Sequence, residues 1–156
     1  MVMLEKMQND EFKKEVVDLK KGYAEEKVKA GTWTEEEAMQ KSEETFRYLL
    51  PDGLSTNNHY FLSIFDQAAK INIGYFWYHF DPEQSQKEAF IYNFVIYETE
   101  RGKGFGKKAI TALERHLKGT GVKKLSLHVF GHNERAIHLY RRMKFSTTDL
   151  HMSKHL

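Results

Sequence analysis

The chain has 156 residues, a net charge of +2 and no cysteine. This length suits one domain with a real core, so we expect residues 1–156 to form a single domain. The lack of cysteine excludes a disulfide framework, a thiolate metal site and a cysteine nucleophile. The N-terminus resembles no signal peptide and no apolar run is long enough to span a bilayer, so we expect a cytoplasmic protein that has no membrane partner.

The charge is unevenly distributed along the chain. Residues 1–100 hold 11 Lys/Arg and 19 Asp/Glu, a balance of −8, whereas residues 101–156 hold 13 and 3, a balance of +10. This asymmetry favours an anionic ligand on the C-terminal part and a cationic ligand facing the N-terminal part. The acidic residues are equally compatible with solvated helix surface in the first 50 residues.

The N-terminal third predicts a short strand and two helices. The strand covers Leu4–Met7, and the first helix begins at Asn9 or Asp10 and ends at Gly31. Its apolar residues recur with helical spacing, which gives it one buried face. Thr34–Glu37 has the pattern of a capping box, which starts a second helix that ends at Pro51–Gly53.

The remaining elements are predicted to alternate between strands and helices. Aromatic and β-branched residues predict strands at 60–65, 71–80, 89–97 and 123–130, helices at 104–117 and 133–143, and a last strand or strand pair at 145–153. This order predicts an α+β (α/β layered) fold, with a twisted mixed sheet flanked by helices. A glycine-rich loop begins the crossover helix between two neighbouring strands.

That loop, Arg101-Gly102-Lys103-Gly104-Phe105-Gly106, is the most informative segment of the sequence. A strand-to-helix turn of this kind directs free N–H groups and the positive end of a helix dipole at one point, which favours a diphosphate. A dinucleotide fingerprint requires a third glycine where Lys107 stands, and a Walker loop requires a hydroxyl where Lys108 stands. Both of these nucleotide sites are therefore poor fits.

The pattern Arg101-x-x-Gly104-x-Gly106 resembles the acetyl-CoA pyrophosphate loop of the GNAT acyltransferases. A second stretch, Asn133-x-x-Ala136-x-x-Leu139-Tyr140-x-x-Met143-x-Phe145, resembles the other CoA-contacting segment of that superfamily, with Lys144 where glycine is common. Further runs resemble the YycN-type branch of bacterial acetyltransferases, namely 23–26, 31–33, 88–92, 125–130 and 152–154. The resemblance then extends over nearly the whole chain and implies the GNAT acyl-CoA N-acyltransferase fold.

The resemblance implies acetyl-CoA as cosubstrate and no metal. Backbone N–H groups from Gly102 through Lys103, Gly104, Phe105 and Gly106 to Lys107 would hold the pyrophosphate, and Arg101 and Lys103 would add charge. The strand Phe94-Val95-Ile96 would supply N–H groups to the oxyanion and to the pantetheine. Cofactor contacts on the second segment are expected from Asn133, Ala136 and Tyr140.

The expected activity is transfer of the acetyl group to a primary amine by direct attack in a ternary complex. Tyr140 is the candidate proton donor to the CoA thiolate. Glu88 is the best carboxylate candidate for the base, because Phe90 stands where some relatives place a glutamate. The alternative role of Tyr140 is packing on its helix, and that of Glu88 is a surface charge at the strand edge. The acceptor is a small cationic amine or a protein or peptide amine, and the N-terminal helices are expected to shape its pocket.

Other functions receive less support from the residues. A non-catalytic acetyl-CoA-binding or sensing module is the alternative to an enzyme. His128, His132 and His138 lack metal-ligand spacing, so we expect no metal site. The aromatic run 75–80 lacks the basic stripe of a nucleic-acid platform, so we expect no nucleic-acid partner. The chain is expected to be a monomer or a homodimer, the latter through an open strand edge.

Overall fold

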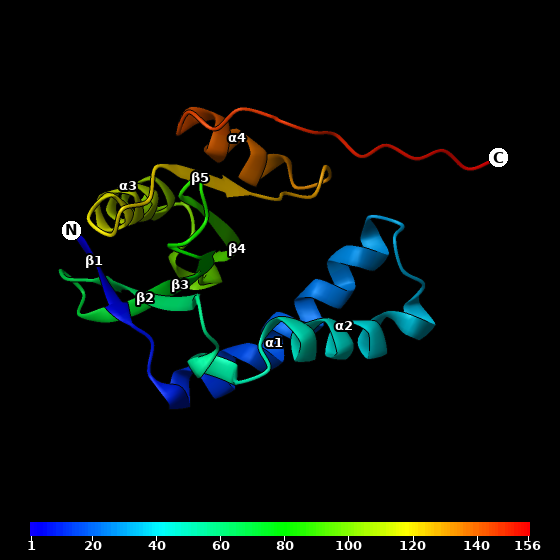
Figure 1. The fold of residues 1–156 in the computed structure, drawn as a ribbon, viewed down its shortest axis with the longest axis horizontal. Helices are drawn as coiled ribbons and strands as arrows, with labels where there is room; N and C mark the ends of the chain where they lie inside the picture. The colour runs from blue at the N-terminus through cyan, green and yellow to red at the C-terminus, as the bar shows by residue number, and fades with distance from the viewer.

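The computed structural model describes residues 1–156 and is built around a mixed five-stranded sheet in the order β1-β2-β3-β4-β5 (Figure 1). The strands are β1 (Val2–Lys6), β2 (His59–Asp66), β3 (Ile71–Phe80), β4 (Glu88–Ile96) and β5 (Lys124–Leu127). The helices are α1 (Asn9–Lys29), α2 (Glu35–Leu49), α3 (Phe105–Lys118) and α4 (Glu134–Arg142), with 3-10 turns η1 (Gly53–Ser55) and η2 (Glu98–Glu100). No helix is long and apolar enough to cross a bilayer.

The sheet combines a meander with one parallel crossover. Strands β1 to β4 pair antiparallel in chain order, and β5 joins β4 in parallel after the connection through α3. Parallel neighbours require such a crossover, and the predicted glycine loop lies at its start. The predicted mixed sheet with flanking helices is confirmed.

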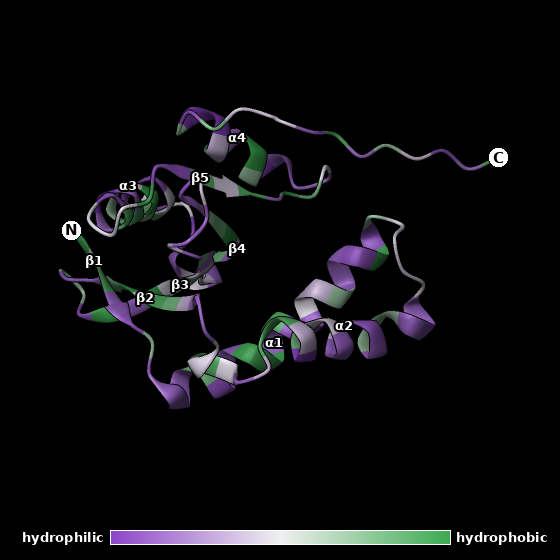
Figure 2. Cartoon of the chain, in the orientation of Figure 1, coloured by the Kyte–Doolittle hydropathy of each residue, from purple (hydrophilic) through white to green (hydrophobic).

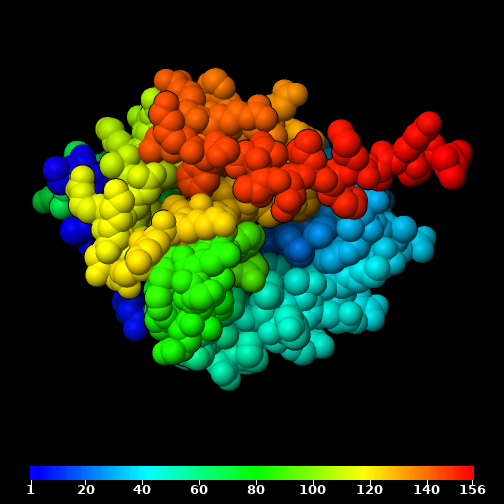
Figure 3. All heavy atoms as spheres, turned by 45° about the horizontal axis from the view of Figure 1, so that its top comes forward, coloured from blue at the N-terminus to red at the C-terminus, as the bar shows by residue number.

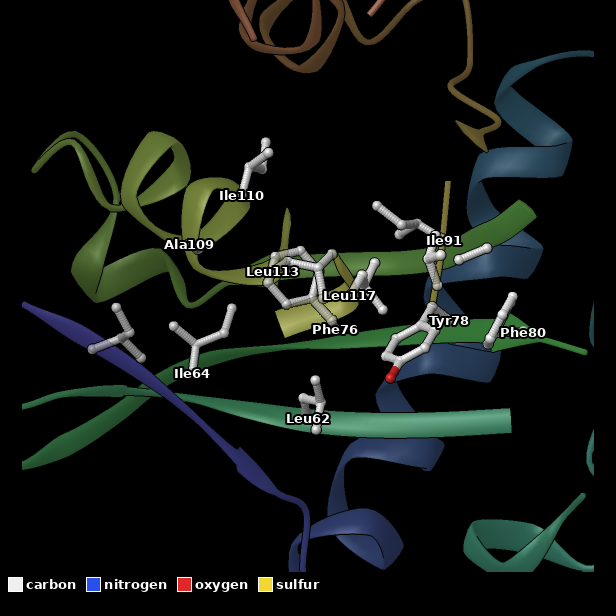
Figure 4. Close-up of a cluster of buried hydrophobic side chains, with 13 residues drawn as sticks. Leu62, Ile64, Phe76, Tyr78, Phe80, Ile91, Ala109, Ile110, Leu113 and Leu117 are labelled. Carbon is white, nitrogen blue, oxygen red and sulfur yellow. The ribbon is translucent and has the colours of Figure 1, made fainter. Parts of the chain in front are cut away.

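Two helical layers cover the sheet. Helix α3 lies on one face, and α1 with α2 lies on the other (Figure 1). The apolar stripe of α3 faces the strands (Figure 2), where Ile110 and Leu113 are fully buried against Phe76 and its neighbours (Figure 4). On the opposite face, Phe46 and Leu19 pack on Trp77 and its neighbours. The alternation of side chains along β3 thus separates the two cores.

A β-bulge in β4 bends the strand at the point where β5 leaves it. Trp77 pairs with Asn93 and Tyr78 with Ile91, so Tyr92 is the extra residue on β4. The pairing of β4 with β5 ends at Ile91 and Leu127. Bulges increase the local twist and often end a ladder. Residues 93–96 of β4 consequently have no strand on the β5 side.

Gly74 fixes how closely β3 approaches the bent part of β4. A Cβ atom on this residue would lie 1.9 Å from the Val95 carbonyl oxygen, and that contact is with backbone. Only glycine therefore permits the observed separation. The position of Val95 and Ile96 depends on this close contact.

Two expectations for the C-terminal part are wrong. The strand predicted at 123–130 is shorter, because β5 ends at Leu127. The strand or strand pair predicted at 145–153 is absent, and the chain after α4 runs outward from the body (Figures 1 and 3). The residue pattern of a strand is present there, but a strand also requires a paired neighbour, and this segment has none.

Candidate active site

The predicted anion loop presents unused backbone donors. The N–H groups of Gly102, Lys103 and Gly104 donate to no backbone acceptor. Helix α3 begins at Phe105, and the N–H groups of its first turn are also free, because no preceding turn supplies carbonyl acceptors. The positive end of the helix dipole adds to them. Together these groups form a site suited to a diphosphate.

The glycines of this loop serve different purposes. Gly102 and Gly104 have φ of 78° and 80°, in the left-handed region that favours glycine, and no atom lies near where their Cβ would be. Gly106 has a different constraint, because its Cβ would lie 3.0 Å from Leu139 Cδ2 on α4. Besides its expected place in the phosphate loop, Gly106 therefore permits close packing between α3 and α4.

The two cations predicted to add charge at the loop have partners within the protein. Arg101 donates from Nε to the Ile96 carbonyl at 3.0 Å, which ties the loop to β4. The Lys103 ammonium pairs with Glu100 at 2.7 Å. Lys107 forms no ion pair within the protein. The free backbone groups are therefore the main feature of the site.

The open part of β4 supplies further donors in line with the loop. Tyr97 N–H bonds to the Ile73 carbonyl at 2.8 Å, so it points toward β3. Because successive N–H groups of a strand alternate in direction, those of Ile96 and Phe94 point to the side that β5 has left. Of the three predicted residues, Phe94 and Ile96 thus direct their N–H groups into the gap. The side chain of Val95 packs on the sheet face that α1 and α2 cover.

The Asn93 side chain forms hydrogen bonds with Phe94 at the gap and with Tyr75 on the neighbouring strand β3. Its Oδ1 accepts from Phe94 N–H at 3.1 Å, and its Nδ2 donates to the Tyr75 hydroxyl at 3.1 Å. The Phe94 donor is therefore satisfied by a neighbouring side chain that any ligand at this position must displace.

Tyr140 lies on α4 and, like Phe94 and Ile96, packs against the core on the α3 face of the sheet. Burial raises the pKa of Tyr140 to about 12, so its phenol is protonated at neutral pH. Unlike the hydroxyls of Tyr75 and Tyr97, the Tyr140 hydroxyl forms no hydrogen bond within the protein. Phe145 packs edge-on against the Tyr140 ring, with 5.6 Å between the ring centroids. A protonated donor without a partner is available to a ligand.

The other predicted site residues have local structural roles. Asn133 caps α4, because its Oδ1 accepts from the Ala136 N–H at 3.2 Å. Glu88 begins β4 and pairs with Lys124 at 3.1 Å. The gap lies toward the other end of β4, beyond Ile91. Glu88 and Tyr140 are therefore associated with different parts of the strand.

An acidic groove lies on the α1 face of the sheet. Its volume is about 700 Å³, and its lining consists of Gln8, Asp10, Glu11, Lys14, Glu15, Asp18, Asn72 and Tyr97. Glu15 accepts a hydrogen bond from the Tyr97 hydroxyl at 2.9 Å, directly after β4. One oxygen of Glu11 is buried without a partner, and desolvation raises the pKa of that carboxyl. The groove combines four carboxylates with one lysine.

Two histidines, His128 and His132, lie just after β5, close to α1. His128 follows the last β4–β5 pair, and partial burial, followed by the nearby Lys27, lowers its pKa below the usual 6.5. A neutral imidazole is therefore present at the gap. His132 contacts Glu26 of α1 at 2.5 Å between Nε2 and Oε2. This contact ties the β5–α4 loop to α1.

Sequence reasoning missed the groove and the histidines as site features. The acidic residues of α1 recur at Glu11, Glu15 and Asp18, which is the spacing of one helix face. That spacing was available as a signal. The position of His128 beside the gap was not, because it depends on where the ladder between β4 and β5 ends.

A profile of the acetyltransferase (GNAT) family matches residues 22–145, and the chain belongs to this family. The chain is therefore an acyltransferase whose relatives take an acetyl group from acetyl-CoA. The parted strands, the free N–H groups and the left-handed glycines are the features that fit this cosubstrate.

Individual relatives support the same conclusion. The chain is 47% identical over 155 residues to the uncharacterised N-acetyltransferase YycN of Bacillus subtilis, with 99% of each chain covered. It is 39% identical to YdgE of the same organism, over 98% of this chain and 97% of YdgE. The crystal structure of YycN matches 100% of this chain and 99% of its own with a TM-score of 0.96.

Proposed function

We propose that the protein transfers the acetyl group of acetyl-CoA to a cationic primary amine by direct attack in a ternary complex. The observation that carries this proposal is the parting of β4 and β5 at the Tyr92 bulge, with Ile96 and Phe94 N–H groups facing the gap. This row of donors leads to the free N–H groups of the loop from Gly102. One extended ligand with a diphosphate and an amide-rich arm would use both.

Each donor group has a role in this proposal. The loop N–H groups bind the pyrophosphate, and the β4 edge orients the arm. A β4 N–H stabilises the negative charge that develops on the thioester oxygen during attack. The Tyr140 hydroxyl donates its proton toward the sulfur as the carbon–sulfur bond breaks.

The acidic groove supports a cationic acceptor. Four carboxylates attract an ammonium group and raise its local concentration beside the end of β4. The groove and Tyr97 lie on the α1 face, opposite the α3 face that the core of Tyr140 occupies. This arrangement would allow the amine and the cosubstrate to approach from different sides.

The acceptor class is tested by release of free CoA thiol with a panel of small amines and peptides. Replacing Glu11→Gln and Glu15→Gln together removes two charges from the groove. We expect the KM for a cationic acceptor to rise about tenfold, with kcat nearly unchanged, because the lost attraction is the same before and during reaction. Preference for a neutral acceptor in the wild type would contradict the proposal.

A matched control is Glu35→Gln with Glu36→Gln. These residues lie exposed in the first turn of α2, so they change the net charge equally outside the groove. Their KM for the acceptor is expected to stay within about twofold of the wild type, because exposed charges are screened by salt.

We place the proton acceptor at His128 rather than at Glu88. His128 is neutral at pH 7 and adjoins the gap, whereas Glu88 is engaged by Lys124. Because the pKa of His128 lies below its usual 6.5, the imidazole is neutral at pH 7, and activity should be lost as the pH falls through that pKa.

The assignment is tested by kcat in two variants. His128→Gln is expected to lower kcat about 100-fold, as for loss of a general base, while Glu88→Gln leaves kcat unchanged. A loss of kcat in Glu88→Gln, with kcat unchanged in His128→Gln, would instead identify Glu88 as the base.

A further inference from the structure

The outer edge of β5 has no neighbouring strand. β5 is the last strand of the sheet and pairs only with β4, so alternate backbone groups of Lys124–Leu127 face outward without a strand partner. An exposed edge of this kind is a template for pairing with another chain.

The chain after α4 lacks partners of its own. Lys144 has a left-handed φ of 74°, and Phe145 N–H still bonds to the Tyr140 carbonyl at 2.9 Å. Beyond that point residues 146–156, here called the tail, make no backbone hydrogen bond and are all exposed. The tail extends outward from the body (Figures 1 and 3).

The tail has the residue pattern of a strand. Thr147 and Thr148 are β-branched, and the apolar side chains of Leu150 and Met152 are 77% and 84% exposed. Such side chains are normally covered when a strand forms. The tail therefore has strand-forming residues but no neighbouring strand to pair with. The outer edge of β5 has backbone groups free for pairing but no neighbouring strand.

We propose that residues 146–152 of one chain pair with the outer edge of β5 of a second copy, in a strand-exchanged homodimer. A twofold axis pairs both tails with both β5 edges at once, so the exchange closes at two chains. Asp149 is the only acidic residue of the tail, and Lys123, directly before β5, offers it an opposite charge, because Lys124 is already paired with Glu88. The tail continues outward, which favours the edge of another copy over its own.

Molar mass in solution provides the first test. Light scattering on the full chain should give twice 18.4 kDa, and a chain that ends at Phe145 should give the monomer mass. Thr148→Pro, which removes a backbone donor within the tail, should weaken the dimer without shortening the chain. Lys154→Pro, outside the pairing segment, should not. A monomeric full chain, or a dimer that survives truncation, would overturn the proposal.

Disulfide trapping distinguishes exchange from a tail that folds onto its own chain. The chain has no cysteine, so Ser126→Cys on β5 and a cysteine scan over residues 146–149 introduce the only thiols. When the β5 variant and the tail variants are co-expressed as separate chains, one tail position should give a disulfide-linked heterodimer. Thr111→Cys on the exposed side of α3 should give none. A double variant that closes only an intrachain disulfide would show self-pairing and refute the exchange.

Discussion

Replacing Tyr140 with Phe is expected to lower kcat about 100-fold to 1,000-fold. The substitution removes only the hydroxyl, which forms no hydrogen bond within the protein, so the packing of the ring against the core should persist. The Kd for acetyl-CoA should change little, because the proton is needed when the sulfur becomes negative. Steady-state kinetics together with calorimetric titration of acetyl-CoA would separate these effects.

Tyr78→Phe is the matched control for that variant. Tyr78 is also buried in the core shared with α3, and burial raises its pKa to about 12 as well. It lies on β3 and has no role in the proposed chemistry. Full activity in Tyr78→Phe with loss in Tyr140→Phe supports proton donation, whereas equal activity in both variants would leave Tyr140 as a packing residue.

Replacing Gly104 with Ala is expected to raise the KM for acetyl-CoA about 10-fold to 100-fold. At φ of 80° an alanine costs about 1–2 kcal/mol, so the loop will move toward a relaxed conformation. That movement turns the N–H groups of residues 102–104 away from a common point and weakens their hold on a diphosphate. Kinetics at varied acetyl-CoA concentration would measure the effect.

Gly121→Ala separates the loss of the site from the loss of stability. Gly121 has a φ of 91° and, like Gly104, no atom near its missing Cβ, but it lies between α3 and β5. Both substitutions should lower Tm by about 2–8 °C, since 1 kcal/mol corresponds to about 2–4 °C in a chain of this size. If Gly121→Ala raised the KM equally, the loop would have no special role.

Local patterns in the sequence predicted most of the fold. Thr34 and Glu37 form the capping box that their spacing indicates, and β3 has the predicted bounds 71–80. The glycine loop also begins α3 as expected. These features depend on residues close together in the chain, where periodicity and capping act directly.

Features that depend on pairing between distant segments were not predictable in this way. The end of the β4–β5 ladder at Leu127 follows from the bulge at Tyr92, which no local pattern marks. The segment after α4 has strand-forming residues but no edge within its own chain. The same limit applies to His128, whose place at the gap is set by the ladder, and to the groove, whose walls come from α1 and β3.

The most direct test of the proposed site is backbone amide hydrogen exchange with and without acetyl-CoA. We expect protection of the Phe94 and Ile96 amides and of the amides from Gly102 to Lys107, since these N–H groups have no backbone acceptor in the free protein or face the gap. Protection confined to these positions would support acetyl-CoA binding along β4 and the loop. Protection elsewhere, with these amides unchanged, would contradict it.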